Sequence, residues 1–168
     1  MTRPLLLLGL CAAALLVVAA PASAQKKDRD SAKASSQRLD KALDSGQISD
    51  AVSAIASFSR FDEPAAVEAL LTVFERASPA LYPNARGVLG GFTTAPSLER
   101  LVAKGLKHRS PIVREQVTLA LGEARPAGLD WAALLGAGLD DDSPLVRAVA
   151  IRELSRARVE TRLDRIIE

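Results

Sequence analysis

A five-residue motif occurs twice in this sequence, as Ser-Pro-Ile-Val-Arg at 110–114 and as Ser-Pro-Leu-Val-Arg at 143–147, 33 positions apart. The similarity extends over residues 105–125 and 138–158, which share Gly, Leu, Ser, Pro, Val, Arg and Ala at matching places. A fixed offset of this size is typical of proteins built from stacked supersecondary units. It constrains the fold more than any other feature of the chain.

Each Ser-Pro pair predicts the start of a helix. A serine hydroxyl can accept a hydrogen bond from an unpaired N–H of the first turn, and proline fits the next position because no backbone donor is needed there. Apolar residues then recur at helical spacing and predict one buried face. This face occurs in four copies, beginning at Ile48, Leu81, Val113 and Val146, and in the last copy Glu153 takes a place where an apolar residue is expected.

A second series of apolar stripes lies between the copies of the first and begins at Val67, Leu98, Trp131 and Leu163. Both series advance by 31 to 33 residues per copy. A helix pair of this size cannot bury its apolar stripe alone, so neighbouring pairs must stack to form a continuous core. The sequence therefore predicts an all-α protein, with Trp131 in the core rather than on the surface.

The two Ser-Pro motifs, with Asp142 before the second and Ala120-Leu121-Gly122 after the first, resemble the HEAT-like repeat in the short form of the phycobilisome (bilin) lyase group. The resemblance covers residues 47–168. It implies an α-α superhelix, a right-handed solenoid of about four HEAT-like helical hairpins. The expected hairpins span approximately 47–77, 78–108, 109–140 and 141–168, preceded by an N-terminal capping helix at 35–46.

Residues 1–24 are predicted to be a signal peptide. Arg3 gives a positive start, the stretch from Leu5 to Ala20 is almost wholly apolar, and Ala22-Ser23-Ala24 has the small-x-small pattern of a cleavage site. We expect cleavage between Ala24 and Gln25 and a secreted or periplasmic protein, the alternative being an uncleaved membrane anchor. Residues 25–34 have no apolar periodicity and are predicted to form a flexible polar tail.

Composition narrows the chemistry that we expect. Cys11 is the only cysteine and lies in the predicted signal peptide, so the processed chain would hold no disulfide, thiol nucleophile or Cys-ligated metal. The formal net charge of +2, with both signs mixed along the chain, does not indicate nucleic acid or an anionic membrane as a partner. His108, the sole histidine, is expected to be a solvated loop residue, because no nucleophile elbow or acid partner is near it in sequence. We therefore expect no enzyme, cofactor or metal.

Arg114 and Arg147 occupy equivalent places in the two motifs, and an acidic run ending at Asp142 precedes the second motif. Stacked repeats bring such positions together. Arg114, Arg147 and Asp142 are therefore expected to form a structural ladder, in which an arginine reaches a carboxylate or a free helix-end carbonyl. The alternative is a site for an anion or an acidic peptide built from the same arginines.

In a HEAT-like solenoid the second-series helices line the concave face. Positions beside their buried stripe are therefore the candidate partner-binding residues: Glu68, Thr72, Arg100, Lys104, Ala132, Ala133, Gly136 and Ala137. The last four are small and apolar. They indicate either an interface that another backbone can approach or tight curvature between repeats.

The leading functional hypothesis is a non-catalytic exported scaffold that binds a protein partner through its concave surface. The lyase resemblance implies an alternative, a lyase or chaperone-like accessory factor for attachment of a prosthetic group. A third hypothesis is a structural adaptor that self-associates through its C-terminal edge, where Ile166 and Ile167 lack a following cap.

Overall fold

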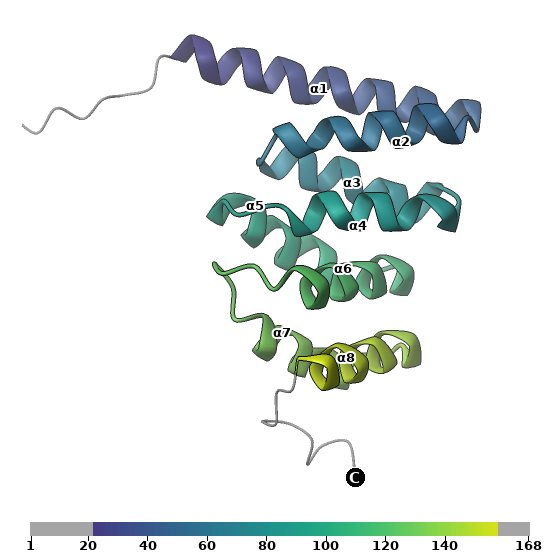
Figure 1. Ribbon diagram of the computed structural model, residues 1–168, viewed down its shortest axis with the longest axis vertical. Helices are drawn as coiled ribbons and strands as arrows, with labels where there is room; N and C mark the ends of the chain where they lie inside the picture. The colour runs from purple at the N-terminus through teal and green to yellow at the C-terminus, as the bar shows by residue number, and fades with distance from the viewer. Residues whose placement is uncertain (1–21, 158–168) are drawn as a thin grey trace, which may run out of the picture.

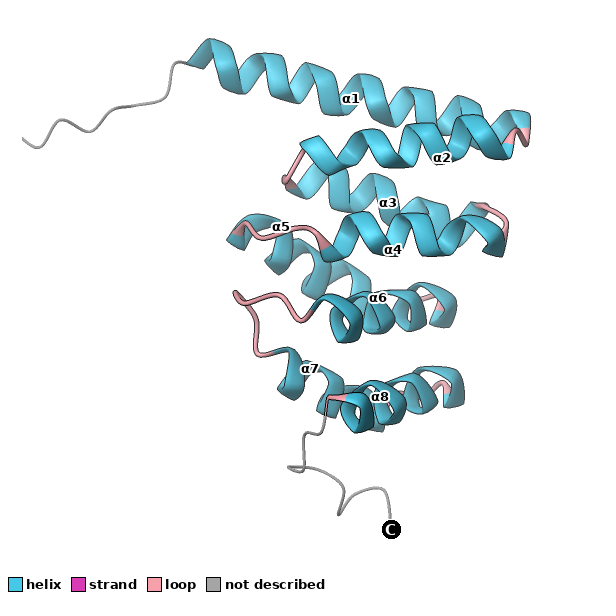
Figure 2. Cartoon of the chain, in the orientation of Figure 1, coloured by secondary structure: helices cyan, strands magenta, loops and turns pink. Residues whose placement is uncertain are grey.

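The computed structural model describes residues 22–157, and this part of the chain is built of helices without strands (Figures 1 and 2). The all-α prediction is confirmed for these residues. The α-helices are α1 (Ala22–Ser45), α2 (Ile48–Ser57), α3 (Pro64–Arg76), α4 (Tyr82–Gly90), α5 (Ala95–Arg100), α6 (Pro111–Ala124), α7 (Trp131–Ala137) and α8 (Pro144–Arg156). Short 3-10 turns lie at Phe58–Arg60, Pro79–Leu81 and Gly138–Asp140, and α5 continues into a π-helical segment at Leu101–Leu106.

The helices are stacked along the long axis of the molecule, from α1 at the top of Figure 1 to α8 at the bottom. Helices α2, α4, α6 and α8 contact one another in succession. Helix α1 packs on α2 and α3, helix α3 on α4, α5 and α6, and helix α7 on α6 and α8. Most of these helices, with the exception of α7, therefore pack on a helix that is not adjacent to them in the chain.

Helices α6 and α8 begin at the prolines of the two Ser-Pro motifs, at Pro111 and Pro144. The preceding serines stand at the N-cap positions, but neither hydroxyl accepts a hydrogen bond from the first turn. The predicted helix starts are therefore correct, while the predicted hydroxyl caps are not formed.

The N-terminal helix is longer than the sequence analysis predicts. Residues 25–34, expected to be a flexible polar tail, are part of α1, which begins well before the capping helix expected at 35–46. The physical reason is that Ala22–Ser45 contains no glycine or proline and that its Ala, Lys, Arg and Gln residues favour helix. Ala32 also continues the buried stripe of Leu39 and Ala42 toward the N-terminus. The helix ends where Gly46 takes a positive φ of 70°.

Several predictions for the two chain ends fall outside the described residues. These are the signal segment up to residue 21, including Cys11, and the last second-series helix from Leu163 with Ile166 and Ile167. Among the residues that are described, no helix is both long enough and apolar enough to cross a membrane.

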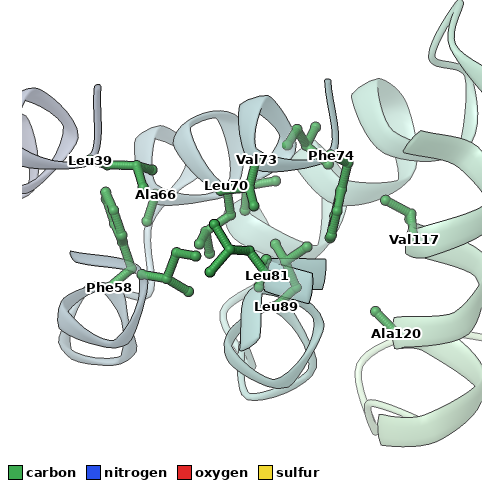
Figure 3. Close-up of a cluster of buried hydrophobic side chains, with 14 of the residues drawn as sticks. Leu39, Phe58, Ala66, Leu70, Val73, Phe74, Leu81, Leu89, Val117 and Ala120 are labelled. Atoms are coloured by element: carbon green, nitrogen blue, oxygen red, sulfur yellow. The ribbon is translucent and has the colours of Figure 1, made fainter. Parts of the chain in front are cut away.

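One hydrophobic cluster connects α1 through α6. Figure 3 shows Phe58, Leu70 and Leu89 within it, and Phe74 between them and Val117 of α6. These side chains come from the first two-thirds of the stack, and each is essentially inaccessible to solvent. The core is therefore continuous across successive layers rather than confined to single helix pairs.

Many residues of the predicted stripes are buried, and Ile48 and Trp131 are among the exceptions. Ile48 begins the first copy, yet it is 54% exposed because it lies in the first turn of α2. Trp131, expected in the core, is only partly buried at the first residue of α7. Its ring instead lies 5.3 Å from the guanidinium carbon of Arg125, which ends α6 in a left-handed conformation (φ 47°).

Glu153 interrupts the apolar face of α8 and is nevertheless fully buried against α6. Glycine at position 122 leaves room for it, since a Cβ there would lie only 2.5 Å from Cγ of Glu153. Oε1 of Glu153 lies 3.1 Å from Nε of Arg152, and Oε2 lies 3.2 Å from Nη1 of Arg156. The α6–α8 contact therefore depends on a glycine facing a buried carboxylate.

We predict that Gly122→Ala lowers the free energy of unfolding by about 1–3 kcal/mol, because the new methyl group overlaps the Glu153 side chain. Urea denaturation followed by circular dichroism measures this change. Gly87→Ala is the matched control, since a Cβ at Gly87 in α4 meets nothing within 4 Å. Helix propensity predicts that this control gains up to about 1 kcal/mol.

Equal losses at the two glycines would contradict the packing argument. The double variant Gly122→Ala/Glu153→Ala should also lose less than the two single variants together, because removing the Glu153 side chain relieves the overlap.

Candidate functional site

Two of the predicted partner-binding residues pair with each other. Oε1 of Glu68 on α3 lies 3.0 Å from Nη1 of Arg100 on α5. Both side chains are more than one-third exposed, so this ion pair contributes at most about 1 kcal/mol. It links neighbouring second-series helices and leaves both residues accessible.

Thr72 and Lys104 lie on the same surface but are not brought together. The Thr72 hydroxyl donates to the carbonyl of Ala69 in its own helix at 2.7 Å. Lys104 is exposed in the π-helical segment after α5.

The small residues of α7 divide between surface and interior. Ala133 and Ala137 are exposed and Ala132 is partly buried, whereas Gly136 is buried. Helix α7 packs on both α6 and α8, so the arc that holds Leu135 and Gly136 is covered. The small apolar surface of α7 is therefore narrower than the sequence suggests.

A groove of about 580 Å³ opens between α1 and α3. Its lining combines polar and apolar residues: Lys33, Ser36, Leu39, Asp40, Glu63, Pro64, Ala65, Glu68, Ala69 and Thr72. Two of these, Glu68 and Thr72, are predicted partner-binding residues. Of the α1 wall, Lys33 lies in the segment that was expected to be a tail, while Ser36, Leu39 and Asp40 lie in the expected capping helix. The sequence analysis predicted that helix but not a groove between it and α3.

The α1 wall of the groove is held to α3 by an exposed arginine. Nη1 of Arg76 lies 2.8 Å from Oδ1 of Asp40, and its Nη2 lies 2.6 Å from Oδ1 of Asp44. Such a two-carboxylate contact orients α1 relative to the end of α3.

At one end of the helices, along the side of the stack, polar residues recur at the spacing of the sequence repeat. Glu75, His108 and Asp141 are each 33 positions apart and lie where one helix gives way to the next. Nε and Nη2 of Arg114 both donate to the Asp141 carboxylate at 2.8 Å, and its Nη1 donates to the carbonyl of His108 at 2.7 Å. Arg114 thus joins the loop before α6 to the loop before α8.

Arg147 repeats part of this pattern one copy later. Its Nη1 donates to the carbonyls of Asp141 at 2.7 Å and Asp142 at 3.1 Å. The carboxylate in the ladder is that of Asp141, whereas Asp142 contributes its backbone carbonyl. The sequence analysis predicted Asp142 as the carboxylate, but Arg114 binds the adjacent Asp141. The geometry of the loop decides which of the two aspartates faces Arg114, and the sequence does not reveal it.

Arg114 and Asp141 shift each other's pKa in opposite directions. The hydrogen bond from Arg114 lowers the pKa of Asp141, while burial acts in the opposite direction and the N–H of Ser143 adds to the lowering. The same hydrogen bond raises the pKa of Arg114. The two side chains are only 15% and 14% exposed, so solvent screens them less than a surface pair.

His108 is not the solvated loop residue that the sequence suggests. Its Nδ1 accepts a hydrogen bond from the N–H of Ser110 at 3.1 Å, and its Nε2 lies 3.4 Å from Oε1 of Glu75 on α3. Asp141 makes the equivalent contact one copy later, where its Oδ1 accepts from the N–H of Ser143 at 2.8 Å. Both side chains therefore accept from the N–H of an N-cap serine, which is a different donor from the first-turn N–H groups that a serine hydroxyl would cap.

At the opposite end of the helices, Asp62 joins two loops. The sequence analysis did not predict this contact. Its Oδ2 accepts from the N–H groups of Thr93 at 2.8 Å and Thr94 at 2.9 Å, and its Oδ1 from the Thr94 hydroxyl at 2.8 Å. Burial raises the pKa of Asp62, but hydrogen bonds from Thr93 and Thr94, together with the nearby Ser97 hydroxyl, outweigh burial and lower it to about 2. The only sequence signal is that Asp62 and Thr94 lie just before helices.

No family model, curated protein or solved structure matches this chain. Within the described part of the chain, the side chains form no group of three or more His, Cys, Asp or Glu suited to a metal ion. The candidate site is therefore the groove between α1 and α3 together with the exposed surface of α5 and α7.

We predict that Asp62→Asn lowers stability by about 1–2 kcal/mol near neutral pH, because the ionised carboxylate accepts several hydrogen bonds. A lowered folded-state pKa means that this stabilisation is present above the unfolded-state pKa of about 4. It is lost as the pH falls toward about 2. Urea unfolding of both proteins across this range should show the difference shrinking with acid.

The control is Asp50→Asn on α2, whose exposed side chain predicts little change in stability. A difference between wild type and Asp62→Asn that stays constant down to the lowest pH would show that the carboxylate charge is not what the two threonines recognise.

We predict a coupling free energy of about 1–3 kcal/mol between Arg114 and Asp141 in a double-mutant cycle of alanine variants. The exposed pair of Arg76 and Asp44, with side chains 44% and 70% exposed, should give less than about 1 kcal/mol. Chemical denaturation of the four proteins in each cycle measures both values. Equal coupling in the two cycles would exclude a special role for the partly buried pair.

Proposed function

We propose that this protein is a non-catalytic exported scaffold of HEAT-like helical hairpins that binds a protein partner through the surface of α1, α3, α5 and α7. In this proposal α1 caps a right-handed α-α solenoid, and the hairpins are α2–α3, α4–α5, α6–α7 and one that begins with α8. The stacked helices and the polar contacts that recur at the 33-residue spacing support it.

The observation that carries the proposal is the groove between α1 and α3. It includes Glu68 and Thr72 of α3, and its lining also includes the apolar Leu39, Pro64 and Ala65. A surface that combines apolar and charged residues is typical of protein interfaces. The exposed Ala133 of α7 extends this accessible surface along the stack.

The role of His108 also supports binding rather than chemistry. Its two ring nitrogens face Ser110 and Glu75 and join the start of α6 to α3. Export is proposed from the signal-like segment at 1–24.

We predict that Ala65→Glu and Ala133→Glu each reduce partner recovery about tenfold or more, because a buried unpaired charge disfavours the bound state. The partner is first captured from the exported fraction by chemical crosslinking and identified by mass spectrometry. Purified partner is then titrated against each variant. Ala148→Glu is the matched control, since Ala148 is exposed on α8, outside the proposed surface.

Circular dichroism must show that each variant keeps the helical content of the wild type. Loss of binding with Ala148→Glu, and normal binding with the other two variants, would place the interface on the α2–α8 side and refute the proposed surface.

A further inference from the structure

Helix α8, at the bottom of the stack in Figure 1, has one side that the described part of the chain leaves uncovered. Five exposed residues share this side at helical spacing: Leu145, Ala148, Ile151, Arg152 and Ser155. Leu145 is 55% exposed and Ile151 is 36% exposed. We call these five residues the α8 end face.

The sequence repeat shows that a following layer would cover most of this face. The residues of α6 that lie 33 positions before Ile151, Arg152 and Ser155 are all buried: Thr118, Leu119 and Gly122. Gly122 lies against Glu153 of α8, so it is α8 that covers this side of α6. The α8 end face is therefore exposed because the described chain has no further layer to place on it.

The first-series helices α2, α4 and α6 each contact the next helix of that series, and α8 has no such neighbour among the described residues. At the opposite end of the stack α1 packs on α2, and its exposed residues between 32 and 45 are all polar. A polar outer helix of this kind closes a stack toward water. The apolar counterpart that a second copy offers to the α8 end face is therefore not α1 but the same face of its own α8.

The residues after α8, which lie outside the described part, are predicted from the sequence to take a different place. Leu163 follows Trp131 at the repeat spacing and so corresponds to the start of α7. Helix α6 is contacted by α7 and, in addition, by α8. A second-series helix beginning at Leu163 would stand where α7 stands on α6, and the place that α8 takes on α6 would stay open.

The end of α8 carries an excess of positive charge that is accessible. Nε of Arg152 lies 3.1 Å from Oε1 of Glu153, and Nη1 of Arg156 lies 3.2 Å from Oε2 of the same carboxylate. Two guanidinium groups therefore share one buried carboxylate. The Arg152 side chain is 58% exposed, and its two terminal nitrogens have no partner in the described structure.

The loop before α8 carries the opposite excess. It holds three carboxylates at 140–142, against the two guanidinium groups of Arg114 and Arg147. Arg114 binds the carboxylate of Asp141, whereas Arg147 contacts only backbone carbonyls of this loop. The side chain of Asp142 is exposed and accepts no hydrogen bond from the described residues. Each end of α8 thus keeps one uncompensated charge, negative before the helix and positive at its end.

An antiparallel pair of α8 helices centred on Ala148 would bring these features together. Leu145 and Ile151 are each three residues from Ala148, so each would meet the other in the second copy. Arg152 and Pro144 are each four residues from Ala148, so Arg152 would lie beside the start of the second helix, which Asp142 precedes. Two-fold symmetry makes each of these contacts twice.

We propose that two copies of this protein associate through their α8 end faces as a two-fold dimer, with Leu145 against Ile151 and Arg152 paired with Asp142 of the second copy. This inference goes beyond the proposed function, because such a dimer carries two partner-binding surfaces. One helix pair is smaller than the interfaces of about 1,600 Å² that most stable complexes bury, so we expect a weak dimer with a Kd in the micromolar range.

Sedimentation velocity of the purified protein at about 5 to 500 µM, a range that brackets such a Kd, tests the association. We expect a reversible equilibrium between monomer and dimer with no larger species. Added salt should weaken the dimer, because exposed charges contribute to it. Protein that stays monomeric throughout would refute the inference, and would show that the α8 end face is covered within one chain or needs no cover.

Ala148→Glu and Ala148→Lys test the two-fold arrangement. Each variant alone should weaken dimerisation at least about tenfold, because like charges meet at the symmetry axis. An equal mixture of the two should form heterodimers, because opposite charges then meet. Ala133→Glu is the matched control, since Ala133 is an exposed alanine on α7 and its variant should dimerise as the wild type does. Circular dichroism shows that each variant is folded.

Dimers that persist in both Ala148 variants, or a mixture that stays monomeric, would refute the antiparallel α8 pair. Species that grow beyond a dimer with concentration would show head-to-tail stacking instead. Asp142→Asn should weaken the dimer about threefold or more, and an unchanged Kd would reject its ion pair with Arg152. The proposed function is judged separately, since Ala148→Glu should still bind the identified partner.

Discussion

The apolar side of each helix is too large to leave in water and can be covered only by helices of the neighbouring layers. Phe74 of α3 illustrates this constraint, because it is fully buried and lies beside Val117, which belongs to α6. The hydrophobic cluster accordingly connects α1 with α6 instead of closing around any one helix pair. Burial of apolar area in successive layers is what holds the stack together, and every other contact is fitted to it.

Stacking by apolar faces leaves the spacing and rotation of adjacent layers loosely determined, since hydrophobic contact has little directionality. Directional polar contacts at both ends of the helices determine this spacing and rotation. Asp62 connects the loop before α3 to Thr93 and Thr94 before α5, while Arg114 connects the loops before α6 and α8 through Asp141. These contacts fix neighbouring loops relative to one another, so the surface between them has a defined shape.

Sequence periodicity was enough to predict most of the helices and much of the core. A helix that is buried on one side has apolar residues at every third or fourth position, and this spacing can be read from the sequence. It correctly indicated Val113 and Val117 as core residues and Pro111 and Pro144 as helix starts. It failed where a contact depends on how two loops are placed. Asp141 and not the predicted Asp142 binds Arg114, and His108, predicted to be solvated, contacts Glu75 and Ser110. It failed also at the N-terminal part of α1, where Ala32, in the segment expected to be a tail, belongs to the same buried stripe as Leu39 and Ala42.

Helix α1 differs from α3 in the size of the residues that it buries, and the groove lies between these two helices. Where α3 presents Val67, Leu70, Leu71 and Phe74 to its neighbours, α1 presents the smaller Ala32 and Ser35 before Leu39. Ser36 of α1 and Ala65 and Ala69 of α3 also bring little side-chain volume to the junction, so the two helices pack along their inner faces and leave the outer side open. A regular layer would fill this space with its own side chains. The N-terminal layer of the stack is therefore where the surface is hollowed between two helices.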